Sequence, residues 1–183
     1  MKLYRKFLVL ISLLRSGACK FHLSLKYPGI TTSGTTFIER GCEIRCVVGS
    51  KIILKHTHIS KGCQIIADNG AEIIIEDSFI GPYTVIVAQK GIRIGKNCQI
   101  AEMVVIRDQN HNFGASGKTI AEQGFISEGI TIGNNVWLAS KATVLKGVTI
   151  GDNTVIGAHS LVNRNCAADS VYAGIPARKI KEF

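Results

Sequence analysis

The stretch ITIGNNVWLASKATVLKGVTIGDNTVIGAHSLV, residues 130–162, carries an aliphatic residue at every sixth position. These aliphatics are Ile132, Leu138, Val144, Ile150, Ile156 and Val162. A small residue follows by four places, as Val136, Ala142, Val148, Thr154, Ser160 and Cys166. A period of six fits neither an α-helix nor a lone strand, and it predicts a parallel β-helix with large and small side chains alternating around a narrow core.

The upstream half repeats at a longer interval. Gly49, Gly70 and Gly91 stand 21 residues apart, so one coil is about three hexapeptides plus a short insert. The inward residues of these coils are predicted to be Ile38/Ile44/Ile53, Ile59/Ile65/Ile74 and Ile80/Ile86/Ile94, followed by Ile100/Ile106. Because each coil buries its apolar face only against the next, we expect one all-β solenoid of about five and a half coils over residues 38–167. A short helix and cap are expected over residues 1–37, and a C-terminal tail over 168–183.

The composition indicates one domain with an anionic partner. With 183 residues and 46% hydrophobic content, the chain is long enough for one continuous core. Its formal net charge is +9, which suits nucleic acid, an anionic membrane or a phosphorylated ligand. The cations that precede the first acidic residue, Glu39, are Lys2, Arg5, Lys6, Arg15, Lys20 and Lys26. Because no aromatic stacking pattern accompanies this N-terminal charge, a nucleic-acid partner is not expected.

The N-terminal charge flanks a short apolar run from Phe7 to Leu14. A bilayer crossing takes about 20 apolar residues, so a transmembrane helix is not expected. A signal peptide is a weaker alternative, because Arg15 interrupts the run and no small-x-small cleavage site follows. Leu3, Phe7, Leu10 and Leu14 share one helical face. We therefore expect a short amphipathic helix that caps the solenoid, contacts anionic lipid at the inner face of the membrane through residues 1–26, or does both.

Most of the six cysteines fit the coil register. Cys42, Cys63, Cys98 and Cys166 each follow an inward aliphatic by four places, in the slot for small side chains. The sequence has no C-x-x-C pair, so no metal site is predicted. Reduced thiols in turn indicate a cytoplasmic protein.

The repeat breaks at residues 107–131, where a polar excursion loop is predicted. Long loops that leave a rigid scaffold are often functional. His111 stands where the chain leaves the coil, and imidazole is well suited to accept a proton near neutral pH. Asp108, Asn110 and Asn112 are candidates to orient His111 or to bind an acceptor. The sequence therefore predicts a catalytic site at the base of this loop, with His111 as its base.

At this point the sequence resembles the hexapeptide-repeat acyltransferases, and within them the sugar and polysaccharide O-acetyltransferases. The resemblance covers roughly residues 38–181 and rests on the period together with ordered motifs. These are Asn135-Val136-Trp137, Gly157-Ala158-x-Ser160 and Gly174-Ile175-Pro176-Ala177. The resemblance implies a left-handed coil and a homotrimer with active sites between subunits.

The resemblance also implies a mechanism. His111 would take the proton of an acceptor hydroxyl while the oxygen attacks the thioester of acetyl-CoA, with no acyl-enzyme and no metal. The co-substrate would contact Ala139, Ser140, Gly157, Ala158, Pro176, Arg178 and Lys179. Relatives often begin the loop with Asp-His-Asn-His, whereas this chain has Asp108-Gln109-Asn110-His111. The missing first histidine leaves His111 as the base and removes a two-histidine contact to the acceptor.

The activity implied is O-acetylation of a sugar hydroxyl in surface polysaccharide biosynthesis, on a lipid-linked or nucleotide-linked glycan precursor. Two enzymatic alternatives remain open: N-acetylation of an amino sugar and O-acetylation of an antibiotic. A β-helical scaffold without catalysis is the alternative outside enzymes. It would need neither the histidine at the base of the loop nor the Gly-Ile-Pro-Ala motif.

Overall fold

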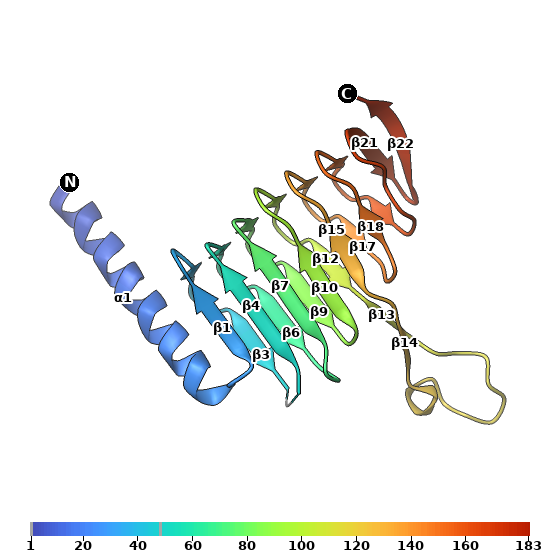
Figure 1. Ribbon diagram of the computed structural model, residues 1–183, viewed down its shortest axis with the longest axis horizontal. Helices are drawn as coiled ribbons and strands as arrows, with labels where there is room; N and C mark the ends of the chain where they lie inside the picture. Colours follow the sequence, from blue (N-terminus) through green and yellow to red (C-terminus); the bar gives the residue numbers. More distant parts are fainter. Residues whose placement is uncertain (1, 48) are drawn as a thin grey trace.

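The structure is a computed structural model that describes residues 2–47 and 49–183, with side chains described except at residues 2–5 and 8. Its body is a stack of coils, in which three parallel sheets form the walls (Figure 1). Sheet A contains β1 (Ile30–Ser33), β4 (Lys51–Lys55), β7 (Glu72–Glu76), β10 (Gly91–Ile94), β15 (Ile130–Ile132) and β18 (Thr149–Ile150). Sheet B contains β2 (Phe37–Ile38), β5 (His58–Ile59), β8 (Phe79–Ile80), β11 (Gln99–Ile100), β16 (Trp137–Leu138), β19 (Val155–Ile156), β21 (Ser170–Gly174) and β22 (Ala177–Glu182). Sheet C contains β3 (Glu43–Cys46), β6 (Gln64–Ala67), β9 (Val85–Ala88), β12 (Val105–Arg107), β17 (Thr143–Val144) and β20 (Leu161–Val162).

This architecture confirms the predicted parallel β-helix, with about six coils. Strands one coil apart pair in parallel along each sheet, and only β21 and β22 at the C-terminal end form an antiparallel hairpin within these three sheets. The ladder begins at β1, which pairs with β4 from Ile30 onward. Strand β1 lies within the residues expected to form the N-terminal helix and cap.

The core follows the predicted period over residues 130–162. All six aliphatics of that stretch and the six small residues that follow them are buried. Upstream, the prediction was wrong at Ile53 and Ile74, which are only half-buried. Their neighbours on both sides point inward instead, as Ile52, Leu54, Ile73 and Ile75. Runs of consecutive aliphatics hide the alternation of a strand, so the sequence could not fix which residue faces the core.

The slots for small side chains also join neighbouring coils. The Cys63 and Cys98 thiols donate to the carbonyls of Gly81 and Gly133, each at 3.1 Å. The Thr57 hydroxyl donates to the Ile75 carbonyl, also at 3.1 Å. These buried polar groups are therefore satisfied by the coil that follows, which ties adjacent coils together.

The cysteines are all free thiols, as the coil register predicted for four of them. Burial raises the pKa of Cys98, and it raises the pKa of Cys166 to about 11. Cys42 is half-buried, and its contact with the Cys63 thiol lowers its pKa to about 7. The coil interior thus keeps most of its thiols protonated at neutral pH.

The N-terminal end is covered by one 25-residue helix, α1 (Lys2–Lys26), which is longer than expected. The helix packs on the first coil through Ser16, Cys19 and Leu23. The Ser16 hydroxyl accepts a hydrogen bond from the Ile38 N–H at 2.9 Å, and the Lys20 ammonium donates to the Thr36 carbonyl at 2.8 Å.

Of the two roles left open for the apolar face of this helix, capping is not the one it has, because a different face packs on the first coil. Phe7, Leu10 and Leu14 are exposed, while the Leu3 side chain lies outside the described ones. Within residues 2–47 and 49–183, no helix combines the length and hydropathy that a bilayer crossing requires.

Candidate active site

The excursion at residues 107–131 is an ordered ribbon. Strand β13 (Gln109–His111) directly follows sheet C and pairs in antiparallel fashion with β14 (Phe125–Ser127) before the chain enters sheet A. The ribbon carries the 3-10 helix η1 (Ala121–Gln123) and projects away from the coils (Figure 1). At its tip, the Gln123 side chain accepts from the Ala115 N–H at 3.0 Å and donates to the Lys118 carbonyl at 3.1 Å.

His111 lies on β13, at the corner where sheet C turns toward sheet A. Its ring stacks on Phe125 across the ribbon, with centroids 4.2 Å apart and planes at 36°. The side chain is exposed, and no hydrogen bond to a ring nitrogen is found within residues 2–47 and 49–183. An imidazole held on one face and open on the other is able to accept a proton from a bound substrate.

Asp108 anchors the base of the ribbon. Its side chain is fully buried, and its carboxylate accepts three backbone N–H bonds, from Gln89 and Lys90 at 2.8 Å and from Gly91 at 2.6 Å. Its carbonyl accepts from the Glu128 N–H at 2.8 Å, which closes the other end of the ribbon. Asp108 therefore fixes the backbone that leads to His111 and is itself enclosed.

The other predicted loop residues differ in their surroundings. Asn110 is exposed, whereas the half-buried Asn112 donates through its amide to the Gln123 carbonyl at 3.2 Å. Gln109 is buried, and its Oε1 finds no hydrogen-bond partner in the part of the chain that the structure describes. A buried acceptor without a partner is costly, which makes Gln109 a notable neighbour of His111.

The small residues assigned to the co-substrate meet at another corner, between sheets B and C. We call Ala139, Ser140, Gly157 and Ala158 the co-substrate row. Ala139 and Ser140 follow β16, and Gly157 and Ala158 follow β19, the next strand of sheet B. The Ala139 N–H donates to the carbonyl of Ile156 at 2.9 Å, so the two segments are stacked. A Cβ on Gly157 would lie 2.9 Å from the Cβ of Ala173 in the next coil, so glycine is required at this corner.

The C-terminal hairpin adjoins this corner. Pro176 lies in its turn, after a cis peptide bond, and the Gly174 N–H donates to the Ser160 hydroxyl at 3.1 Å. Arg178 and Lys179 are exposed on β22. Glu182 lies 2.7 Å from the Lys179 ammonium and raises the pKa of Lys179. Two exposed cations therefore lie beside the co-substrate row.

One chain does not bring the two halves of the predicted site together. Sheet C separates His111 from the co-substrate row. Ala139 and Ser140 of the row come before strand β17 of this sheet, whereas His111 comes after its strand β12. The corner that carries His111 is instead shared with Glu128, which pairs with Lys146. His111 and the co-substrate row thus occupy different corners of the same coils.

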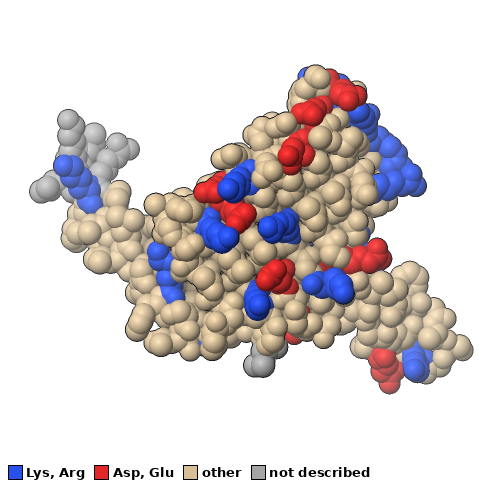
Figure 2. All heavy atoms as spheres, viewed as in Figure 1, with Lys and Arg blue, Asp and Glu red and all other residues tan. Residues whose placement is uncertain are grey.

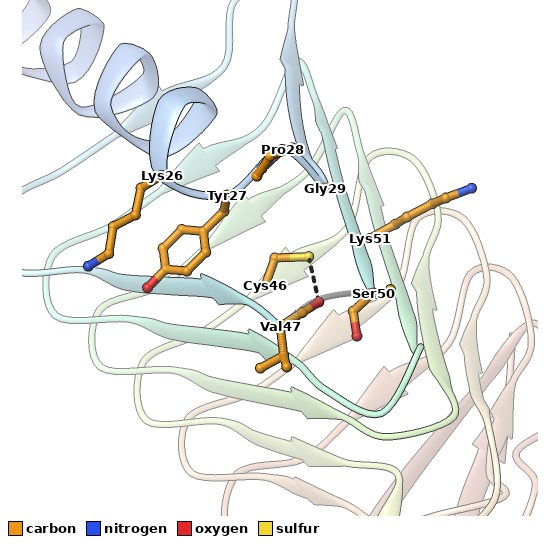
Figure 3. Close-up of a pocket in the computed structure, with 9 residues that line it drawn as sticks. Lys26, Tyr27, Pro28, Gly29, Cys46, Val47, Ser50 and Lys51 are labelled. Carbon is orange, nitrogen blue, oxygen red and sulfur yellow. Dashed lines mark hydrogen bonds between the residues drawn. The ribbon is translucent and has the colours of Figure 1, made fainter.

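A cavity of about 590 Å³ lies elsewhere, between the end of α1 and the first coil. Figure 3 shows Tyr27 and Val47 facing this space, with Lys26 and Lys51 at its edges. None of the residues predicted for catalysis or co-substrate binding lines it. We therefore place the candidate site at His111, an exposed imidazole at the base of the anchored ribbon, rather than in this cavity.

Phe125 is the contact that the sequence did not reveal. It stands 14 residues after His111, and only the antiparallel register of β13 and β14 brings the two rings together. The polar excursion shows no apolar alternation strong enough to predict a hairpin.

Comparison with known proteins supports the repeat assignment. The family described as "Bacterial transferase hexapeptide (six repeats)" matches residues 129–164. The chain is 32% identical over 101 residues to WbbJ of Escherichia coli K12, named as a lipopolysaccharide biosynthesis O-acetyl transferase, covering 51% of this chain and 52% of WbbJ. It is 39% identical over 92 residues to the galactoside O-acetyltransferase of the same organism, covering 50% and 44% of the two chains. The chain thus spans about half the length of these curated relatives.

Solved structures show the same fold at low sequence identity. A mutant of AntD, an N-acyltransferase from Bacillus cereus, in complex with dTDP-4-amino-4,6-dideoxyglucose and coenzyme A, superimposes with a TM-score of 0.73, at 22% identity over 88% of both chains. A maltose O-acetyltransferase from Clostridium difficile 630 gives a TM-score of 0.56 at 24% identity, over 85% of this chain and 70% of that one. The fold and the repeat match together confirm the predicted resemblance to the hexapeptide-repeat transferases.

Proposed function

We propose that the protein is an acetyl-CoA-dependent O-acetyltransferase that acts on a sugar hydroxyl, in the synthesis of a surface polysaccharide. The observation that carries this proposal is His111, which is exposed at the base of an anchored ribbon and held on one face by Phe125. The named activities of WbbJ and the galactoside O-acetyltransferase support the reaction class. AntD binds coenzyme A, which supports an acyl-CoA donor.

In this mechanism His111 accepts the proton of the acceptor hydroxyl. The acceptor oxygen then forms a bond to the acetyl carbon, the C–S bond breaks, and the coenzyme leaves as a thiol after taking up the proton. Backbone N–H groups at the coil corners would stabilise the negative charge on the thioester oxygen. The small side chains at Ala139 and Gly157 leave room for the pantetheine arm, and Arg178 and Lys179 suit the phosphates at the adenosine end of the co-substrate.

The proposal includes a homotrimer, because His111 and the co-substrate row stand on different corners. A cyclic trimer would let His111 of one chain face the row of the next. A mixing experiment tests this. Trimers of His111→Ala alone lack the base, and trimers of Ala158→Trp alone have a blocked co-substrate row, so each should be inactive. When the two variants are co-refolded, activity should return at interfaces where His111 of an Ala158→Trp chain faces the intact row of a His111→Ala chain. If only unmixed wild-type chains were active, the shared site would be wrong.

N-acetylation of an amino sugar is the second candidate, favoured by the AntD complex with an amino sugar nucleotide. Both reactions need the same base and donor, so the fold does not separate them. Mass spectrometry of products from paired acceptors, matched except for a hydroxyl or an amine, would decide. Labelling of the amine alone would overturn O-acetylation.

The experiment that tests the base uses purified protein, acetyl-CoA and a panel of sugar acceptors. His111→Ala should lower turnover by a factor on the order of 10² to 10⁴ while calorimetric binding of acetyl-CoA stays nearly unchanged. His22→Ala, which removes an exposed histidine of α1, is the matched control and should keep full turnover. Equal turnover of the two variants would exclude His111 as the base. Failure of the wild type to bind acetyl-CoA at millimolar concentration would favour the scaffold alternative.

A further inference from the structure

Helix α1 packs on the solenoid through one face of its C-terminal half. Ser16, Cys19 and Leu23 form the packed face. At 100° per residue, a position two places further along lies about 200° around the helix. The outward face therefore carries the residues two places before or after the packed ones, and these include Leu14, Phe21 and Leu25.

The outward face is apolar along its length. The stripe consists of Phe7, Leu10, Leu14, Phe21 and Leu25, with exposed fractions between 54% and 68%. Their spacings of three, four and seven residues keep them on one side of the helix. Val9, Ile11 and Leu13 add further exposed apolar surface around the N-terminal half of the helix. At 1.5 Å per residue the stripe runs for about 27 Å. A continuous exposed row of large apolar side chains marks a surface that contacts something else.

The charges beside the stripe identify a partner. Lys6 and Arg15 are exposed on the two sides of the stripe, and Lys26 is exposed at the C-terminal end of the helix. No acidic residue occurs before Glu39. Figure 2 shows basic side chains and no acidic ones on the visible part of α1, whereas both signs mix over the coils. Long basic side chains can keep their charge at an interface while their stems lie along apolar groups. This arrangement is complementary to an anionic, partly apolar surface.

The position of α1 leaves its stripe accessible. The helix lies across the N-terminal end of the stack, with all coils on its other side (Figure 1). A second copy of this chain is a poorer occupant, because pairing two such stripes would bring like-charged flanks together.

We propose that α1 docks the protein on an anionic lipid surface, with the stripe inserted into the headgroup region and the basic flanks on lipid phosphates. The helix lies in the plane of the interface while its opposite face stays on the first coil. Binding strength then comes from apolar area and from charge together. This inference is independent of the proposed acetyl transfer, which concerns the ribbon and the later coils.

Vesicle sedimentation tests the docking face. Full-length protein should pellet with vesicles of phosphatidylglycerol and phosphatidylcholine, pellet much less with phosphatidylcholine alone, and be released by high salt. The double variant Leu14→Glu/Leu25→Glu should lower the partition coefficient by on the order of a hundredfold. Ile180→Glu, an equivalent change at an exposed site on β22, should bind as the wild type does.

Three results would overturn the proposal. These are unchanged pelleting of the double variant, equal binding to both vesicle types at every salt concentration, and no pelleting of wild type at all. In the last case, the oligomeric state decides what covers the stripe. If the wild type forms a larger oligomer that the double variant does not form, the stripe makes contacts between copies of the chain. Circular dichroism of each variant shows that α1 still folds, so a loss of binding reports on the stripe itself.

Discussion

The coils and the ribbon of residues 107–131 are built on opposite rules. In the coils, every inward side chain packs on the coil above and below, so the fully buried isoleucines repeat one structural role many times. In the ribbon, the side chains mostly face solvent, and few contacts hold the tip. The coils therefore provide rigidity, and the ribbon provides a chemically distinct surface at a fixed place. The difference teaches that stability and chemistry can be separated in this chain by a few residues at the junction.

The largest expected effect tests the stability half of this comparison. Ile86→Ala removes a fully buried side chain between neighbouring coils and should lower the free energy of unfolding by about 2–5 kcal/mol. Phe113→Ala removes a large side chain from the ribbon tip, where it is 82% exposed, and should change stability by less than about 0.5 kcal/mol. Urea denaturation measures both. Similar losses would mean that the ribbon packs more firmly than its exposure indicates.

The junction should show both kinds of effect. Asp108→Ala leaves the N–H groups of Gln89, Lys90 and Gly91 without their acceptor and should cost about 2–4 kcal/mol of stability. Because Asp108 positions the backbone before His111, turnover should also fall, with less change in acetyl-CoA affinity. Asp108→Asn keeps one acceptor oxygen and should recover part of both losses. If stability fell while turnover per folded molecule were unchanged, Asp108 would be a structural residue only.

The sequence predicted the coils well because their signal is repeated. Each inward position from Ile132 to Val162 is one of six similar observations, so chance matches are few. The prediction was wrong at Ile53 and Ile74, where three consecutive aliphatics satisfied more than one register. Only the pairing of Leu54 with Ile75 and of Ile75 with Ile94 decides which residue faces inward.

The site was predictable only in part, because it depends on contacts that occur once. The place of His111 at the base of the excursion follows from the break in the repeat. Its stacking on Phe125 and the enclosure of Asp108 depend on backbone register that no period encodes. The same holds for α1, where the apolar face was evident but its direction depends on Ser16 and Leu23 packing underneath.

A smaller effect is expected from the ring that supports the base. Phe125→Leu keeps an apolar residue on β14 but removes the stacked ring 4.2 Å from His111. Aromatic pairs of this kind contribute about 0.5–1.5 kcal/mol, so turnover should fall roughly threefold to tenfold. Stability should hardly change, because Phe125 is exposed. Steady-state kinetics with the Ile126→Leu variant as a matched control would measure this, and an equal effect of both variants would remove the role assigned to the stacking.

The smallest effect concerns Gln109 and is informative through its sign. A buried Oε1 without a hydrogen-bond partner destabilises the folded state. Gln109→Leu removes that atom at similar volume and should therefore raise the free energy of unfolding by up to about 1 kcal/mol. If the same atom accepts a hydrogen bond from the bound acceptor, the variant should also raise the acceptor KM severalfold while kcat and acetyl-CoA affinity stay near wild type. Gain of stability with loss of acceptor affinity is the signature of a residue kept for binding. A stabilised variant with unchanged KM would instead show that Gln109 serves neither the ribbon nor the site.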